Sequence, residues 1–480
     1  MEENFACFLE SNAHRFGARN ALIWNGGSLT WSELNQRASG FAKFLMEQGV
    51  RPGDRVALLL PNRWVFLVAL FGILKLGATA APLSPRLKTE ELDVILADLK
   101  PKQVVTAVKV HGAAWVTPRF TESPAIIIYT SGSTGRPKGA VFSHRALAIA
   151  NRSWGEVVMG LTENDMVLGV LPYSHNYGMY SGLLAPLLFG STVALVERFT
   201  PEVVIDTIQR YHVTVFPGVA TMFRRLLNFP LFAHADLSSL RLTVSGAAPC
   251  SWELMKEWQA KTGTRILRGY GMTEIPRCIS YFVGDPMDFP DAVGRPVSGV
   301  EIRITDEAGR PVPYGEVGEM WIKSPTAMDG YLEAPQETEA VRVDGWFKTG
   351  DVASVSREGL IRIVGRKRER ILRGGFSVFP QEVETVLISH PAVAEAAVVG
   401  IPSLDLGEEV VAFVTLKPMA ETTPEALITH CREHLAHFKY PRRVTFLKEM
   451  PRGATGKILK SELLKGEFPT KASGSQSSPN

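Results

Sequence analysis

Residues 129–139 have the types and spacing of a phosphate-binding loop. They read Tyr-Thr-Ser-Gly-Ser-Thr-Gly-Arg-Pro-Lys-Gly and follow an apolar run, residues 125–129, typical of a buried strand. Glycines let successive backbone N–H groups converge on an anion, hydroxyl groups add donors, and Lys138 adds positive charge. The P-loop of kinases and GTPases requires glycine where Pro137 stands, so this is another class of loop. We predict a polyphosphate site formed by Thr130, Ser131, Gly132, Ser133, Thr134, Gly135 and Lys138.

Further motifs follow this loop in a fixed order along the chain. Together with the loop they resemble the adenylate-forming superfamily, which includes acyl-CoA synthetases, adenylation domains of nonribosomal peptide synthetases and firefly luciferase. The resemblance extends over nearly the whole chain and favours the acyl-CoA synthetase branch, the fatty-acid or aryl-acid CoA ligases. The motifs occupy residues 171–175, 245–249, 270–274, 349–351, 365–366 and 451–457.

The resemblance implies catalytic roles in the attack of a carboxylate on the α-phosphorus of ATP. Glu274 resembles the ligand of Mg²⁺, a hard cation that prefers carboxylate and phosphate oxygens. Thr273 and Thr130 would face the phosphates, with Thr130 on the metal side. Lys457 resembles the lysine that bridges the attacking carboxylate and the α-phosphate, where negative charge accumulates. The catalytic set implied is therefore Lys457, Glu274 and Thr273.

The rest of the nucleotide site is implied in the same way. Asp351 resembles the residue that accepts both ribose hydroxyls, and Arg366 would assist it. The adenine slot and its surroundings would be formed by Ala247, Ala248, Tyr270 and Gly271.

Residues 365–370, Gly-Arg-Lys-Arg-Glu-Arg, would by themselves suggest a basic patch, but the resemblance implies a hinge. In the family the C-terminal domain swings about the residue two after the conserved arginine, which here is Arg368. The family more often has Asp or Lys there, so the assignment rests on position. Gly374 and Gly375 would line the tunnel for the pantetheine arm of coenzyme A.

The acid pocket is expected around His175, Asn176, Gly178 and Gly246. No aspartate lies near His175, so an α-amino acid substrate is disfavoured, because its buried ammonium group would have no partner. Gly178 and the apolar residues after it fit a medium- or long-chain fatty acid, which we expect first. Asn176 resembles aryl-acid activating members, the alternative. The thiol is expected to be that of CoA, with an acyl carrier protein as the alternative partner.

Composition limits the protein classes that remain. The 480 residues are 45% apolar and 21% charged, which indicates a globular chain of two or more domains. A net charge of +3 gives no broad footprint for nucleic acid. Four widely separated cysteines and no secretory signal favour a cytoplasmic protein. The longest apolar run, residues 64–74, is shorter than the roughly 20 residues of a transmembrane helix, so no transmembrane segment is expected.

Short apolar runs that alternate with helical patterns predict an α/β fold. Thr30 and Glu33 have capping-box spacing before a helix, and residues 56–60, 64–74 and 79–83 predict a βαβ unit. From about Ala292 polar and apolar residues alternate, as in antiparallel strands. We expect doubly wound sheets plus a distorted β-barrel in an AMP-binding domain (1–365), a small mobile α+β domain (366–466) and a disordered tail (467–480).

His430 and His434 match the H-x-x-E-H pattern of some zinc peptidases. The match is short, and no third ligand is indicated. Apolar residues recur on one side of the same predicted helix and just after it, which favours packing against a core over metal binding. They are Leu427, Cys431, Leu435 and Phe438.

Overall fold

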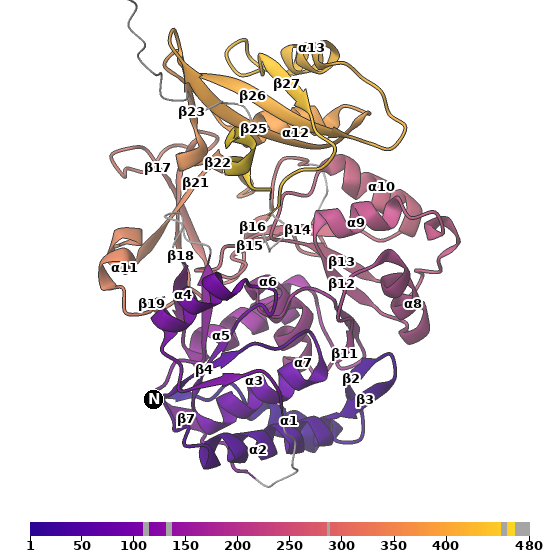
Figure 1. Cartoon of the computed structure of the whole chain (residues 1–480), viewed down its shortest axis with the longest axis vertical. Coiled ribbons are helices and arrows are strands. Elements are labelled where there is room, and N and C mark those ends of the chain that lie inside the picture. The colour runs from indigo at the N-terminus through magenta and orange to yellow at the C-terminus, as the bar shows by residue number, and fades with distance from the viewer. Residues whose placement is uncertain (109–114, 131–136, 286–288, 453–457, 466–480) are drawn as a thin grey trace, which may run out of the picture. The chain divides into compact units, whose positions relative to one another are not determined.

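The computed structural model describes residues 1–108, 115–130, 137–285, 289–452 and 458–465 (Figure 1). The chain divides into two compact units. The larger comprises Met1–Arg303, Trp321–Thr349 and Ser356–Arg362, and the smaller comprises Ile304–Met320, Gly350–Val355 and the chain from Ile363 onward. A large N-terminal sheet domain and a smaller C-terminal domain confirm the predicted α/β fold class. The predicted tail lies outside the described residues.

A six-stranded sheet of the larger unit has the order β19-β9-β8-β5-β4-β6. Strands β4 (Arg55–Leu58) and β5 (Thr79–Pro82) pair in parallel on either side of helix α3 (Trp64–Leu76), which confirms the βαβ prediction. The helix extends past the predicted apolar run to include Lys75, whose side chain is fully buried. The other strands are β6 (Gln103–Val105), β8 (Ile126–Thr130), β9 (Lys138–Phe142) and β19 (Gly330–Tyr331).

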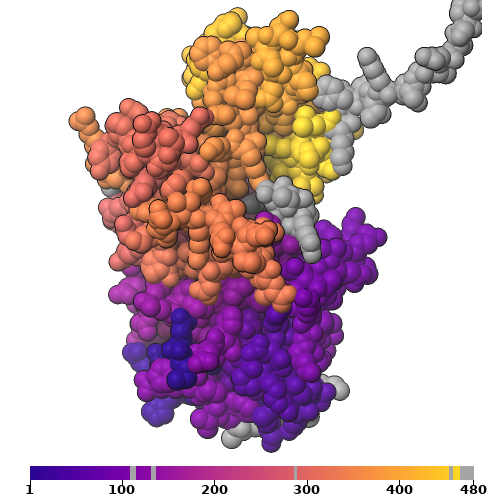
Figure 2. Space-filling model, turned by 90° about the vertical axis from the view of Figure 1, so that its left-hand side faces the viewer, coloured from indigo at the N-terminus to yellow at the C-terminus, as the bar shows by residue number. Residues whose placement is uncertain are grey.

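Helix α2 (Trp31–Glu47) begins at the predicted capping box. The Glu33 N–H donates to Thr30 Oγ1 over 3.2 Å, and the Thr30 N–H donates to Glu33 Oε2 over 2.8 Å. Helix α2 packs on α3 and on α1 (Cys7–Phe16). Before α1, strand β1 (Glu2–Glu3) pairs with β7 (Phe120–Thr121), and Figure 2 shows these first residues (indigo) at the surface among purple atoms.

The second large sheet has nine strands in the order β16-β15-β14-β13-β12-β10-β11-β2-β3. Its central strands, from β14 to β2, are parallel, as predicted, and its edge strands are antiparallel. The strands are β2 (Asn20–Trp24), β3 (Gly27–Thr30), β10 (Met166–Gly169), β11 (Thr192–Leu195), β12 (Val215–Gly218), β13 (Leu242–Ser245), β14 (Ile266–Tyr270), β15 (Ile279–Ser280) and β16 (Arg295–Pro296).

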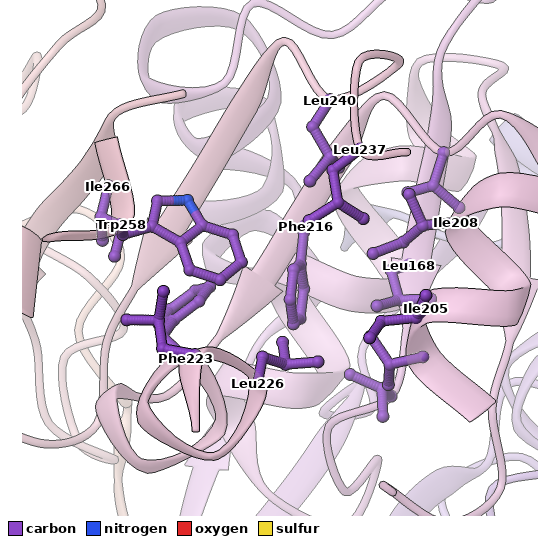
Figure 3. Packing of buried hydrophobic residues seen from close by; sticks show 14 of the residues in the cluster. Leu168, Ile205, Ile208, Phe216, Phe223, Leu226, Leu237, Leu240, Trp258 and Ile266 are labelled. Carbon is purple, nitrogen blue, oxygen red and sulfur yellow. The ribbon is translucent and has the colours of Figure 1, made fainter. Parts of the chain in front are cut away.

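An apolar core fixes helices against this sheet (Figure 3). Trp258 of α10 lies 4.9 Å from Phe223 of α9 between ring centroids, and Phe223 lies 5.1 Å from Phe216 of β12. Each ring is fully buried, which favours folding by roughly 2 kcal/mol or more per side chain. The core thereby positions the carboxyl ends of β12, β13 and β14. The helices of this core are α8 (Pro201–Tyr211), α9 (Ala220–Leu227) and α10 (Trp252–Thr262). Other helices of the larger unit are α4 (Thr89–Leu99), α5 (His144–Arg152), α6 (Asn176–Met179) and α7 (Ala185–Leu188).

A five-stranded sheet forms within residues 301–366, where alternation predicted strands. Its order is β17-β18-β21-β20, with β22 beside β21. Strands β17 (Glu301–Thr305) and β18 (Gly318–Lys323) lie in the region after Ala292 where alternation predicted antiparallel strands. The remaining elements are α11 (Pro335–Val341), β20 (Arg342–Val343), β21 (Trp346–Val355) and β22 (Ile361–Arg366).

The C-terminal sheet has the order β24-β23-β26-β25, with β27 beside β26. Helices α12 (Pro380–Ser389) and α13 (Pro424–His434) contact β25 and β27 (Figure 1). Leu427 and Cys431 of α13 belong to the apolar core of this unit, which agrees with the prediction that their side of the helix serves packing. His430 Nε2 lies 3.0 Å from Ser389 Oγ. The strands are β23 (Ile371–Arg373), β24 (Phe376–Val378), β25 (Val393–Ser403), β26 (Gly407–Leu416) and β27 (Arg443–Phe446), and α14 (Lys460–Lys465) follows.

In the portion of the chain that is described, no helix is both long and apolar enough to cross a membrane.

Candidate active site

The predicted phosphate loop connects two antiparallel strands. Thr130, the last residue of β8, pairs in register with Lys138, the first residue of β9. Both ends of the loop are therefore held together by the sheet, and both side chains are half-buried. The predicted ligands between them, Ser131, Gly132, Ser133, Thr134 and Gly135, lie outside the described residues.

Glu274 is held by a tyrosine that the sequence analysis did not identify. The Tyr331 hydroxyl donates to Glu274 Oε1 over 2.8 Å, and the Met328 N–H donates to the Glu274 carbonyl over 2.8 Å. Burial, with the neighbouring carboxylate adding to it, raises the pKa of Tyr331, so the phenol remains a donor at neutral pH. Lys138 Nζ lies 5.2 Å from the centroid of the same ring. Tyr331 thus connects the lysine of the phosphate loop to the predicted metal ligand.

The chemistry of Glu274 fits a hard cation. One of its oxygens accepts the tyrosine hydrogen bond, and Glu274 forms no ion pair with any residue for which coordinates are described. A carboxylate without a cationic partner is a suitable ligand for Mg²⁺ beside phosphate oxygens. Thr273 is half-buried next to it.

The predicted acid-binding residues gather around Tyr177 in α6. Its hydroxyl donates to the carbonyl oxygens of Gly218 (3.0 Å) and Val244 (2.9 Å), so the side chain spans the ends of β12 and β13. A Cβ atom at Gly246 would lie 2.8 Å from the Tyr177 ring, which explains the glycine there. Trp154 packs on Tyr177, with 5.8 Å between ring centroids.

The neighbours of Tyr177 in sequence are fixed as well. His175 Nδ1 accepts the Tyr177 N–H over 3.2 Å, and Asn176 Nδ2 donates to the Met272 carbonyl over 3.0 Å. Gly178 lies against the backbone of Pro172. The structure thus joins Asn176 to the segment that leads to Glu274, and His175 to the start of α6.

The predicted adenine-binding residues lie at the ends of two adjacent strands. Ala247 and Ala248 follow β13 and are exposed, and Ala247 has a φ of 65°, which is strained for a residue with a Cβ atom. Tyr270 ends β14, half-buried, and Gly271 after it is exposed. Strands β13 and β14 are parallel neighbours, so these positions share one edge of the sheet.

In the smaller unit, Asp351 and Arg366 form an ion pair. Arg366 Nε lies 2.9 Å from Asp351 Oδ1, and the aspartate side chain is 3% exposed whereas that of the arginine is 38% exposed. The two residues predicted to bind ribose are therefore in direct contact. The prediction for Lys457 lies outside the described residues.

The predicted hinge and tunnel residues occupy exposed turns. Arg368 lies in the short 3₁₀ helix Lys367–Glu369 and is exposed. Gly374 and Gly375 join β23 to β24 with φ angles of 57° and 82°. Two successive left-handed residues form the tight hairpin turn that favours glycine, so the turn alone explains both residues.

The sequence analysis also missed a buried arginine. Arg277 follows Glu274 by three residues and lies over Trp154, with 4.0 Å from the guanidinium carbon to the ring centroid. A charge inside the apolar run of residues 275–279 was the available signal. No comparable sequence signal marks Tyr331.

Comparison with known proteins identifies the family. The pattern of the family described as "AMP-binding enzyme" matches residues 9–121 and 110–332, and that of the "AMP-binding enzyme C-terminal domain" matches residues 382–457. The chain belongs to this family. This AMP-binding enzyme is 32% identical to the long-chain-fatty-acid–CoA ligase of Yersinia pestis over 95% of its own chain and 92% of the relative.

Two further relatives have other names. The feruloyl-CoA synthase of an Amycolatopsis species is 34% identical over 92% of this chain and 95% of the relative. The crystal structure of ATP-bound MatB from Rhodopseudomonas palustris has a TM-score of 0.91 and 30% identity, and covers 97% of this chain and 99% of that chain. The protein is an AMP-forming acyl- or aryl-CoA ligase that uses ATP, CoA and a small carboxylic acid.

Proposed function

We propose that the acid is compact and of the aryl class, rather than the fatty acid expected first. The carrying observation is the position of Tyr177, whose hydroxyl binds two strand ends and whose ring is backed by Trp154. A long alkyl chain needs an open channel beyond the reacting carboxylate, whereas here the Tyr177 side chain reaches both strand ends and Trp154 packs on its ring.

The apolar residues that suggested a fatty acid support the same proposal. Met179, Leu183 and Leu184 have no exposed surface, so they have no face free to line a channel. Near these apolar residues, the polar residues Asn176 and Arg277 are the ones that retain a small exposed surface, 8% and 7%. The fatty acid remains the second candidate, because the relative from Yersinia pestis carries that name.

In the first half-reaction, a carboxylate oxygen of the acid attacks the α-phosphorus of ATP, and pyrophosphate leaves. Thr130, Lys138 and the loop between them bind the phosphates, and Thr273 faces them. Glu274, oriented by Tyr331, holds Mg²⁺, which when bound supplies positive charge to the phosphate oxygens. Lys457 contacts the carboxylate and the α-phosphate together.

The nucleoside is held by two further groups of residues. The Asp351 carboxylate accepts the ribose hydroxyls, and the ion pair with Arg366 orients it. Adenine lies between Tyr270, Gly271 and the backbone of Ala247 and Ala248.

In the second half-reaction, the CoA thiolate attacks the acyl carbonyl and AMP leaves. The domain that begins at residue 366 turns about Arg368 and brings Gly374 and Gly375 to the pantetheine arm. For this step we retain the domains predicted from the sequence, residues 1–365 and 366–466.

Pyrophosphate release across an acid panel tests this function. Benzoate, 4-hydroxycinnamate, octanoate and palmitate are supplied with ATP and Mg²⁺, with and without CoA, and thioesters are detected by mass. We expect aryl thioesters that require CoA. Turnover of the fatty acids alone would contradict the aryl assignment, and adenylate that is transferred only to an acyl carrier protein would contradict the CoA assignment.

A further inference from the structure

Arg277 is a charged side chain in the interior of the larger unit. It lies between β14 and β15 and is only 7% exposed. Burial lowers its pKa to about 10, so the guanidinium remains charged at neutral pH. A buried charge is costly unless an opposite charge or several hydrogen bonds compensate it.

The described residues supply neutral partners for this charge but no opposite charge. No ion pair involves Arg277 among residues 1–108, 115–130, 137–285, 289–452 and 458–465. Nε and Nη2 both donate to a single oxygen, Ser280 Oγ, over 3.3 and 3.0 Å. A guanidinium has five N–H donors, and within those ranges its side-chain acceptors are Ser280 Oγ and the Tyr177 hydroxyl, with no carboxylate among them. The face of the Trp154 ring contributes a cation–π contact.

The guanidinium is nevertheless fixed in place. A Cβ atom at Gly269 in β14 would lie 2.6 Å from its Cζ, Nε and Nη2 atoms, so it rests directly on the strand backbone. Ser280 Oγ, its acceptor, itself donates to the Tyr281 carbonyl over 2.7 Å. A rigid guanidinium with no carboxylate partner among the described residues is prepared for an acceptor from outside the protein.

Arg277 belongs to the acid-binding cluster rather than to the phosphate-binding residues. Trp154, on which it stacks, packs on Tyr177, and the guanidinium and the Tyr177 hydroxyl are near enough to influence each other's pKa. On the phosphate side, Lys138 and Glu274 are connected through Tyr331. An anion at Arg277 is therefore part of the acid, not part of ATP.

We propose that the substrate carries a second carboxylate, away from the one that reacts, and that Arg277 binds it. This inference rests on the proposed function. A carboxylate can accept two parallel hydrogen bonds from a guanidinium and neutralises its charge. An acid without that group would leave the guanidinium without an anionic partner, so Arg277 determines specificity between diacids and monoacids.

Matched acids that differ only in the second carboxylate test the inference. Terephthalate is compared with benzoate, and adipate with hexanoate, by kcat/KM for CoA thioester formation. We expect the wild-type enzyme to favour the better diacid over its monoacid by about 10²-fold. Arg277→Met should abolish or reverse that preference, and Arg277→Lys should retain part of it.

A neighbouring buried arginine provides the control. Arg268 donates to the carbonyl oxygen of Phe289 over 3.1 Å and also to the carbonyl of Pro290, so its role is structural. Arg268→Met should change kcat/KM for diacid and monoacid by the same factor.

The outcomes distinguish a failure of the role of Arg277 from a failure of the proposed ligase function. Equal kcat/KM for diacids and monoacids in the wild-type enzyme, or an equal loss on both in Arg277→Met, would overturn the role of Arg277 and leave the ligase function intact. No thioester from any acid would overturn the proposed function and this inference with it. If Arg277→Met does not fold, the wild-type comparison and Arg277→Lys decide.

Discussion

At the scale of single residues, the proposed first half-reaction depends on Lys457. Lys457→Ala should lower the rate of acyl-adenylate formation by a factor of about 10² or more, because charge in the transition state loses its counter-charge. Conversion of a supplied acyl-adenylate to thioester should be largely spared. Both rates are measured in single turnovers, with the exposed Lys448→Ala as control. Equal loss in the two steps would contradict domain alternation.

Tyr331 should act as a positioning residue for Glu274. Tyr331→Phe removes a hydrogen bond to a carboxylate, which is worth about 1.5–3 kcal/mol, so adenylation should slow by roughly 10–100-fold. The Mg²⁺ concentration for half-maximal rate should rise, since the metal ligand loses its orientation. Tyr211→Phe, which removes a hydroxyl bonded to the Trp24 carbonyl, should change neither quantity. Unchanged Mg²⁺ dependence in Tyr331→Phe would refute this role.

The residues of the site were predictable where a motif carried them. The roles of Thr130, Glu274 and Asp351 were predicted from motifs that resemble those of the family, and they stay predictions. Tyr331 and Arg277 were not, because their importance arises from contacts that only the folded chain creates: Tyr331 reaches Glu274 across 57 positions. The spacing of residues along the sequence does not reveal such contacts.

At the scale of elements, apolar runs predicted where the strands lie but not where each strand begins. An apolar run indicates buried residues, whereas a strand is defined by its backbone hydrogen bonds. Val213 is fully buried, yet β12 begins at Val215. The apolar run of the sequence stops before Lys75, but helix α3 continues to Leu76, because Lys75 is accommodated inside α3 by partners far away in sequence. Its Nζ lies 2.6 Å from Glu10 Oε1 of α1 and 3.1 Å from Thr117 Oγ1.

This ion pair between the fully buried Lys75 of α3 and the partly exposed Glu10 of α1 should be important for stability. Glu10→Gln leaves the Lys75 charge buried without its counter-charge and should cost about 3 kcal/mol of unfolding free energy, measured by urea titration. Adding Lys75→Met should recover much of that loss. As a control, Glu163→Gln removes an exposed pair with Arg15 and should cost at most about 1 kcal/mol. Equal losses in Glu10→Gln and Glu163→Gln would contradict the account.

At the scale of the whole molecule, stability should fall in mild acid because of His144. This side chain is fully buried, its Nδ1 accepts the Phe5 N–H over 3.0 Å, and burial lowers its pKa to about 4. The unfolded chain binds the proton near pH 6.5, so stability is complete above that pH and decreases as the pH falls toward 4. The loss from this group at pH 5 should be about 2 kcal/mol.

His144→Asn should reduce that dependence, because the amide oxygen can accept the same N–H and does not titrate. Unfolding free energies of both proteins are compared between pH 7 and pH 5. The same acid-induced loss in the variant would show that other groups cause it.

The architecture itself followed from the alternation of strands and helices, which predicted parallel sheets in the larger unit and an α+β pattern in the smaller one. The identity of the acid did not follow, because it depends on how Trp154, Tyr177 and Arg277, from separate segments, fill a small volume.

Transfer of oxygen from the acid to AMP tests the central claim most directly. The enzyme is given ATP, Mg²⁺, CoA and an acid from the panel whose carboxylate is labelled with ¹⁸O, and the AMP is analysed by mass. We predict one ¹⁸O atom in each AMP formed, because a carboxylate oxygen attacks the α-phosphorus and stays with AMP when the thiol displaces it. Thioester formation with unlabelled AMP would contradict an acyl-adenylate intermediate and the account built on it.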